Sequence, residues 1–319
     1  MAESEGSKRS PLRMVLIVTV VSVLLYAALA IGGDIQALGD ELNRYAWTAF
    51  AAGVGLATLN YGLRFLRWQL YLSRLGVSVP WRSSLRIFLA GFVMSVTPGK
   101  VGEVLKSVLL HEAHGVPIAK TAPIVVAERL TDLLALVLLA GVGALAFSGG
   151  AYAALLGGLI GLAIWLLIAV RPLGELALRI GDRLLPSSLA PKLRQAYGSL
   201  RVLVGPVSMA RATLLSVLAW GLECVSVYVI AAGFGSGLNL IESTFAYAGP
   251  TILGAVALLP GGLGVTEAGM VALVLDLGSF ERPVAVAITI LVRLATLWWA
   301  VLLGAGAFVL QRRAVRPAP

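Results

Sequence analysis

A short apolar run that ends in a helix-breaking turn limits what this chain can fold into. The run covers residues Ile87–Val96, and Thr97-Pro98-Gly99-Lys100-Val101-Gly102-Glu103 follows it. A membrane-spanning helix needs about 20 apolar residues, so this run enters a bilayer without crossing it. Proline lacks a backbone N–H and glycine turns at little cost, so we expect a break at Pro98-Gly99. Broken backbone at membrane depth must be buried in protein or line a watery cavity.

A second break of the same kind lies late in the chain. Pro260-Gly261-Gly262-Leu263-Gly264-Val265-Thr266-Glu267 stands between two short apolar runs. Glu103 precedes Arg129 by 26 residues, and Glu267 precedes Arg293 by the same 26. We predict that the two breaks face each other and form one polar site inside the membrane.

The composition predicts an all-α, polytopic membrane protein that forms a single integral membrane domain over residues 1–319. Of its 319 residues, 59% are hydrophobic and 13% are charged, and the mean hydropathy is +0.92. Its single cysteine, Cys224, allows no internal disulfide. The net charge of +9 lies in short loops beside apolar spans, so we expect lipid contact and no nucleic-acid partner.

About six full spans and two re-entrant broken-helix hairpins account for the apolar segments. The predicted spans are 14–31, 45–63, 121–147, 152–170, 212–234 and 283–310, and the hairpins are 85–114 and 241–277. The polar stretch 171–206 is predicted to form a cytoplasmic interfacial linker with a pair of helices. This layout places 21 of the 25 Lys and Arg residues on one side. The chain is then a multi-pass protein of the cell (inner) membrane, and the positive-inside rule puts both termini in the cytoplasm.

The same layout predicts two repeats of opposite orientation. Repeat one covers about 45–147 and repeat two about 207–310, and each contains a Pro-Gly break, a Glu and a buried Arg. Inverted-topology repeats with broken helices are a recurring transporter design, and their substrate site lies near the midplane.

These motifs resemble those of the lysylphosphatidylglycerol synthase transmembrane-region family, also called flippase-like domain proteins, which includes the membrane half of the multiple peptide resistance factor. The resemblance covers about residues 60–311 and is carried by Arg64-Phe65-Leu66-Arg67-Trp68, Pro98-Gly99-Lys100-Val101-Gly102-Glu103-Val104-Leu105-Lys106, Glu128-Arg129-Leu130-Thr131-Asp132, the second break and Arg293. It implies movement of phospholipids or lipid-linked sugars between leaflets, through a cavity that two inverted halves share. Met94-Ser95 and Lys100 depart from the family pattern. No soluble aminoacyl-transfer domain is expected, so lipid aminoacylation is not expected either.

Arg129 and Arg293 are the main candidates for binding a lipid phosphate, because an arginine deep in a span is usually paired or faces water. The alternative is a structural ion pair: Arg129 with Glu128, Asp132 or Glu103, and Arg293 with Glu267. Glu103 and Glu267 either cap their half-helices or titrate during transport. The remaining candidates for substrate contact are Lys100, Pro98, Gly99, Pro260, Gly261, Gly262, Glu128 and Asp132, and for the glycines the alternative is tight helix packing.

Other polar residues are expected to have structural roles. Lys106 is predicted to snorkel toward the membrane surface, and Arg64 and Arg67 to form an interfacial anchor. A site role for Glu223 stays open. His111 and His114 lack a third ligand, so we expect no metal site there.

The leading function is a lipid flippase or scramblase without a cofactor, whose partner is a lipid with an anionic headgroup or a lipid-linked saccharide. A homodimer is possible. An intramembrane lipid phosphatase or pyrophosphatase is the alternative, and a passive assembly or regulatory partner is the third. The chain has no nucleotide-binding loop, so any coupling would use protons, ions or the lipid gradient.

Overall fold

The computed structural model describes residues 35–97, 102–144, 189–235 and 237–315, together with the single positions 152, 155, 159 and 163. These residues are almost entirely helical and contain no strand, which confirms the all-α prediction. The predicted span 14–31 lies outside them, and so does the span 152–170 apart from the single positions.

The helices follow the predicted segments closely, although two boundaries differ. Those of the first half are α2 Ile35–Arg44, α3 Trp47–Arg74, α4 Trp81–Ala90, the 3-10 helix η1 Gly91–Met94, α5 Leu105–His114, α6 Ile118–Thr121 and α7 Pro123–Ala144. Those of the second half are α10 Ala190–Leu203, α11 Pro206–Ala232, α12 Leu240–Val256, the 3-10 helix η3 Pro260–Gly262, α13 Val265–Gly278, α14 Arg282–Arg293, the π-helical η4 Leu294–Trp298 and α15 Trp299–Val315. Helix α3 continues 11 residues past its predicted end at residue 63, and α11 begins six residues before residue 212.

Three helical stretches among the described residues are long and apolar enough to cross a membrane: Pro206–Ala232, Pro260–Gly278 and Arg282–Ala314. Helix α7 is also long, but it carries the charged residues Glu128, Arg129 and Asp132. These charges need partners inside the protein, because an unpaired charge in the bilayer core is costly.

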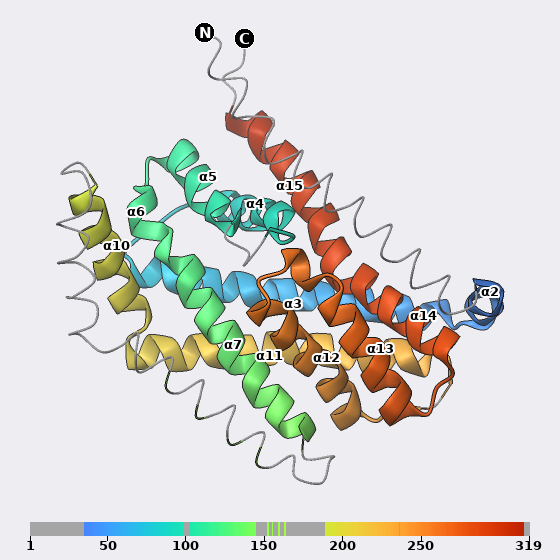
Figure 1. Cartoon of the computed structure of the whole chain (residues 1–319). Coiled ribbons are helices and arrows are strands. Elements are labelled where there is room, and N and C mark those ends of the chain that lie inside the picture. The colour runs from blue at the N-terminus through green and yellow to red at the C-terminus, as the bar shows by residue number, and fades with distance from the viewer. Residues whose placement is uncertain are drawn as a thin grey trace.

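Helix packing is reciprocal between the two halves of the chain. Helices α3 and α11 run along each other, α7 packs on α12, and α15 packs on α4 and η1. Figure 1 shows the α4–α5 and α12–α13 hairpins extending toward opposite edges of the view. The long last helix of each half therefore supports the hairpin of the other half.

Two glycines permit these contacts between halves. A Cβ on Gly143 of α7 would lie 2.8 Å from the backbone nitrogen of Phe245, and one on Gly304 of α15 would lie 2.4 Å from that of Val93. Real Cβ atoms do not approach backbone this closely. Small residues at these two positions therefore let neighbouring backbones meet, as is common between membrane helices.

Replacing Gly304 with alanine is expected to lower the free energy of unfolding by about 1–3 kcal/mol, since the added methyl group pushes α15 away from η1. The matched control is Gly306→Ala on the same helix, where a Cβ meets nothing within 4 Å. Thermal unfolding in detergent measures both. Equal midpoints for the two variants would contradict the close backbone approach.

The second hairpin has clear start and turn signals. The Asn239 side chain accepts hydrogen bonds from the first turn of α12, and Glu242 accepts one in return from the Asn239 backbone at 2.8 Å. This capping box fixes the start of the helix. At the turn, Gly261, Gly262 and Gly264 have φ angles of 61°, 71° and 86°, which side chains with a Cβ rarely adopt.

The predicted break at Pro98-Gly99 lies outside the described residues, as do Lys100 and Val101, and the helices on either side are η1, which ends at Met94, and α5, which begins at Leu105. On either side of this stretch, the Gly102 backbone N–H donates to the Thr97 hydroxyl at 3.0 Å, and that hydroxyl donates to the Met94 carbonyl at 2.7 Å. These two hydrogen bonds tie the ends of the break together.

The two breaks meet inside the protein. A Cβ on Gly261 would lie 3.8 Å from the Cα of Val96, which is the last residue of the first apolar run. Val96 also packs with Leu263, Leu297 and Val301. The end of the first apolar run and the turn of the second hairpin therefore lie against each other.

Candidate functional site

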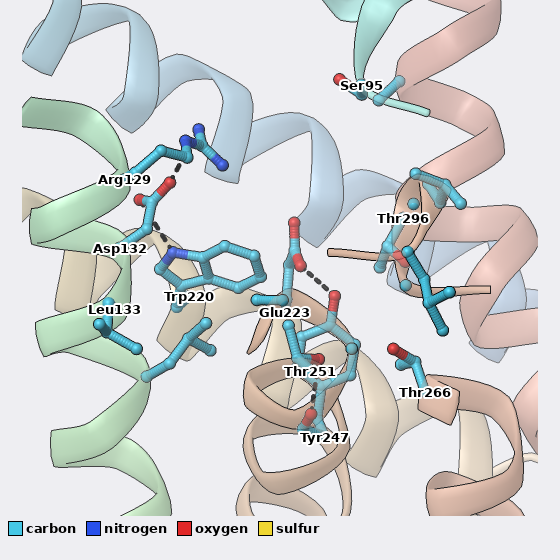
Figure 2. A pocket seen from close by; sticks show the side chains of 18 of the residues that line it. Ser95, Arg129, Asp132, Leu133, Trp220, Glu223, Tyr247, Thr251, Thr266 and Thr296 are labelled. Carbon is cyan, nitrogen blue, oxygen red and sulfur yellow. Dashed lines mark hydrogen bonds and ion pairs between the residues drawn. The ribbon is translucent and has the colours of Figure 1, made fainter. Parts of the chain in front are cut away.

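A cavity of about 290 Å³ lies where the two breaks meet. Both halves of the chain line it, and its charged lining residues are Arg64, Arg129, Asp132, Glu223 and Arg293. Gly261 and Gly262 of the second break line it, and so does Ser95, which precedes the first break. Figure 2 shows Arg129 and Asp132 on one side, Glu223 and Tyr247 in the middle, and Ser95, Thr266 and Thr296 on the other.

Arg129 reaches the cavity from α7 and is held by two carboxylates. Its Nη2 lies 3.0 Å from Oδ2 of Asp132 and 3.3 Å from Oε2 of Glu103. Its side chain keeps an exposed fraction of 26%, whereas Glu103 is almost fully buried. The predicted pairing with Asp132, one helical turn away, is therefore confirmed, and Arg129 still faces open space.

Lys106 does not snorkel, so that prediction was wrong. Its exposed fraction is 2%, and its Nζ lies 2.6 Å from Oε2 of Glu128 and 3.5 Å from that of Glu103. The ammonium group also sits 5.0 Å from the ring centre of Trp68. The missing side chain of Gly91 makes room for it, since a Cβ there would lie 2.5 Å from Cγ of Lys106. Two carboxylates and an aromatic face compensate the buried charge.

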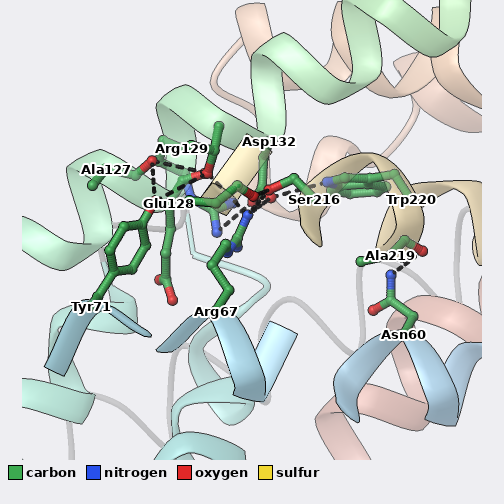
Figure 3. Close-up of polar contacts among 12 residues, drawn as sticks. Asn60, Arg67, Tyr71, Ala127, Glu128, Arg129, Asp132, Ser216, Ala219 and Trp220 are labelled. Carbon is green, nitrogen blue, oxygen red and sulfur yellow. Dashed lines mark hydrogen bonds and ion pairs between the residues drawn. The ribbon is translucent and has the colours of Figure 1, made fainter. Parts of the chain in front are cut away.

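Arg67 is likewise no interfacial anchor. It is buried at the junction of α3, α7 and α11, where its Nη1 lies 2.5 Å from Oδ1 of Asp132 and 3.1 Å from the Thr131 hydroxyl (Figure 3). The same nitrogen also donates to Ser216 on α11. Trp220 donates to Asp132 at 3.0 Å. Asp132 therefore joins three helices and positions Arg129 at the cavity wall.

The second half repeats the pairing with one arginine and one glutamate. Arg293 donates from Nε to Oε1 of Glu267 at 2.7 Å and from Nη2 to the Gly261 carbonyl at 2.6 Å. The other carboxylate oxygen of Glu267 accepts from the Gly264 N–H at 2.7 Å. The predicted ion pair and the predicted cap are both confirmed. Arg293 also lines the cavity, so the structural role and contact with a ligand are compatible.

Several cavity residues were missed or left open by sequence reasoning. Tyr247 on α12 and Glu223 on α11 both line the cavity, and Tyr247 donates a hydrogen bond to Glu223. Tyr61 donates to the Thr296 carbonyl at 2.5 Å, inside the π-helical turn that follows Arg293. A tyrosine in an otherwise apolar helix is a signal that could have identified Tyr247, because a buried phenol needs a partner.

The remaining predicted residues fall into three groups. Gly261 and Gly262 line the cavity, and Pro260 begins the adjacent η3 turn. Three glutamates are ion-pair partners of buried or cavity-lining cations: Glu103 of Arg129, Glu128 of Lys106 and Glu267 of Arg293. Pro98, Gly99 and Lys100 lie outside the described residues.

His114 contacts the Ser83 hydroxyl at 2.7 Å, and no cluster of metal-ligating side chains occurs in the part of the chain that the structure describes.

Comparison with known proteins gives matches over most of the chain. A family model described as the lysylphosphatidylglycerol synthase TM region matches residues 14–304. A UPF0104 membrane protein of Pyrococcus horikoshii is 26% identical over 291 residues, which cover 81% of this chain and 86% of the relative. A UPF0104 membrane protein of Methanocaldococcus jannaschii is 27% identical, and the match covers 72% of this chain and 97% of the relative. A UPF0104 membrane protein of Methanothermobacter thermautotrophicus is 23% identical over 313 residues, and the match covers 89% of this chain and 90% of the relative.

Proposed function

Because this chain belongs to the family described as the lysylphosphatidylglycerol synthase TM region, we propose that it is a lipid flippase or scramblase. Its substrate would be an anionic phospholipid or a polyprenyl-phosphate-linked lipid. One observation carries the proposal: Arg129 and Arg293, each 26 residues after the glutamate that follows its break, line one cavity.

The reciprocal helix packing supports two inverted repeats. In this proposal α3 corresponds to α11, the α4–α5 hairpin to the α12–α13 hairpin, and α7 to the pair α14–α15. Both hairpins then enter the membrane from opposite sides, and the polar cavity lies near the midplane. Rocking of one repeat against the other would expose the cavity to each leaflet in turn.

The cavity wall suits a molecule with a charged head and apolar tails. Arg129 and Arg293 replace part of the water around an anionic headgroup, and the hydroxyls of Ser95 and Thr251 add polar contacts. Val256 and Leu258 also line the cavity but are largely exposed at its edge. Acyl or prenyl chains would leave the cavity past these side chains and stay in the bilayer.

The charge distribution sets the proposed orientation. With both termini in the cytoplasm, the basic residues that follow the buried part of α3 and those of 189–211 face the cytoplasmic leaflet of the cell membrane: Arg74, Arg82, Arg86, Lys192, Arg194, Arg201 and Arg211. Attraction to anionic lipid there would concentrate the substrate near the first hairpin.

Arg129→Gln is expected to slow lipid exchange about tenfold or more, because a charge-assisted contact to the headgroup is lost. The fold should tolerate this change, since Glu103 keeps Lys106 and Asp132 keeps Arg67 as partners. The assay is leaflet exchange of labelled lipid by purified protein in liposomes, with labelled phosphatidylglycerol and a labelled polyprenyl-phosphate sugar tested separately.

The matched control is Arg312→Gln, which removes an exposed arginine paired with Glu112 outside the cavity. It should leave exchange unchanged. Exchange no faster than in protein-free vesicles for both lipids would overturn the proposal. Phosphate release from a lipid pyrophosphate would instead support the intramembrane phosphatase alternative.

A further inference from the structure

The arginines that line the cavity differ in how their charge is compensated. Arg129 contacts two carboxylates, and Arg293 contacts the Glu267 carboxylate and the Gly261 carbonyl. Among the described residues, no ion pair and no hydrogen bond joins Arg64 to any acceptor. We propose that Arg64 is the residue that directly binds the phosphate of the transported lipid. The lipid in this inference rests on the proposed function, whereas the anion site does not.

Arg64 is deeply buried and yet reaches the cavity. Its exposed fraction is 7%, and it lies on the cavity wall. Its Nε is buried without an acceptor. Burying this N–H without an acceptor costs free energy, because it has lost water and gained no hydrogen-bond partner. A site that keeps such a group is set up to recover that cost when an anion arrives.

The packing of Arg64 fixes the direction of its donors. Its Cζ lies 5.2 Å from the centre of the Phe92 ring, so the aromatic face holds the charged group. The planar fork of a guanidinium keeps its N–H groups in one plane and matches two oxygens of a phosphate. Phe92 belongs to η1, directly before the first break. The same segment therefore positions both Arg64 and the Ser95 hydroxyl at the cavity.

The two carboxylates on the cavity wall have other partners. Asp132 contacts Arg67, Arg129 and Trp220, and Glu223 accepts from Tyr247. Among the described residues, neither of them forms an ion pair with Arg64. Of the cations on the cavity wall, Arg64 is the one for which the described residues supply no acceptor, so the ligand we infer carries one negative charge, as a phosphodiester does. A terminal phosphate or a pyrophosphate would bring a second negative charge, and Arg129 and Arg293 are already paired with carboxylates.

The test measures binding and transport separately. Purified protein in detergent is titrated with dihexanoyl-phosphatidylglycerol, with farnesyl phosphate and with inorganic phosphate, and binding is followed by tryptophan fluorescence and thermal shift. Arg64→Gln is expected to weaken binding of the phosphodiester about tenfold or more, since charge-assisted hydrogen bonds are lost. Without ligand its unfolding midpoint should equal or exceed that of the wild type. Arg74→Gln, an exposed arginine on the same helix, is the control and should bind normally.

Arg64→Lys provides a second variant that keeps the charge, and it should bind the phosphodiester more weakly because it loses the two-oxygen contact. Unchanged binding by both variants would overturn the site. Tighter binding of farnesyl phosphate or inorganic phosphate would overturn the phosphodiester assignment. If Arg64→Gln loses binding while the wild type exchanges no lipid in liposomes, the anion site stands and the proposed function fails. If the wild type exchanges lipid and Arg64→Gln does so equally well, the proposed function stands and the Arg64 site fails.

Discussion

Arg293→Ala is expected to lower the free energy of unfolding by about 3–5 kcal/mol, the usual cost of removing one partner of a buried ion pair. Glu267 has an exposed fraction of 1%, so its carboxylate would lose its bonded cation in a site with little access to water. The Gly261 carbonyl would lose its donor in the same change. Arg282→Ala on the same helix removes an exposed arginine and should have little effect. Equilibrium unfolding in mixed micelles measures both variants.

A double replacement separates the structural role of Arg293 from its role in transport. In Glu267→Gln with Arg293→Met, an amide nitrogen or oxygen replaces each oxygen of Glu267, the amide oxygen can still cap the Gly264 N–H, and neither member of this pair leaves the other's charge unpaired. Buried ion pairs exchanged for neutral groups of similar size often keep full stability. We expect the double variant to regain most of the stability and to remain inactive in lipid exchange. Normal exchange by a stable double variant would remove Arg293 from the proposed site.

The features that sequence could predict are those that lie close together along the chain. Pro260-Gly261 predicts a break from backbone chemistry alone, and this break has the expected left-handed glycines. Asp132 stands one helical turn from Arg129, so this pair follows from helix geometry. The cap by Glu267 follows from its position at the start of α13.

Partners far apart in sequence were not predicted. Arg67 appeared to lie beyond the end of a span, whereas its partners Asp132 and Ser216 are 65 and 149 residues away. Lys106 appeared to be near the surface, yet Glu128 on another helix meets it. Charge next to an apolar span is equally compatible with an interface and with a buried network, so hydropathy alone cannot decide between them.

A local signal on α3 did exist. Its buried polar and aromatic residues recur at helical spacing and mark a single face of the helix: Asn60, Arg64, Arg67, Trp68 and Tyr71. Asn60 donates to the Ala219 carbonyl on α11 at 2.7 Å, which places this face against protein. A stripe that mixes large aromatic and polar side chains indicates a buried polar network better than it indicates an interfacial anchor.

Arg67→Ala is expected to destabilise the protein by about 3–5 kcal/mol, because it removes the cation at the junction of α3, α7 and α11. Asp132 would keep Arg129 and Trp220 but lose its shortest contact. Arg129 would then be pulled toward Asp132 and away from the cavity, so lipid exchange should fall even in molecules that remain folded.

Two comparisons isolate this effect. Arg74→Ala removes an exposed arginine from the last turn of the same helix and should change the free energy of unfolding by about 0.5 kcal/mol or less. Arg67→Lys keeps the charge on a shorter side chain, whose ammonium group does not reach the place of Nη1 among Asp132, Thr131 and Ser216, so its loss should be intermediate. Unfolding in mixed micelles gives all three values. If Arg67→Ala is no more harmful than Arg74→Ala, then Asp132 is held by α7 and α11 alone, and the junction cannot be what positions Arg129 at the cavity.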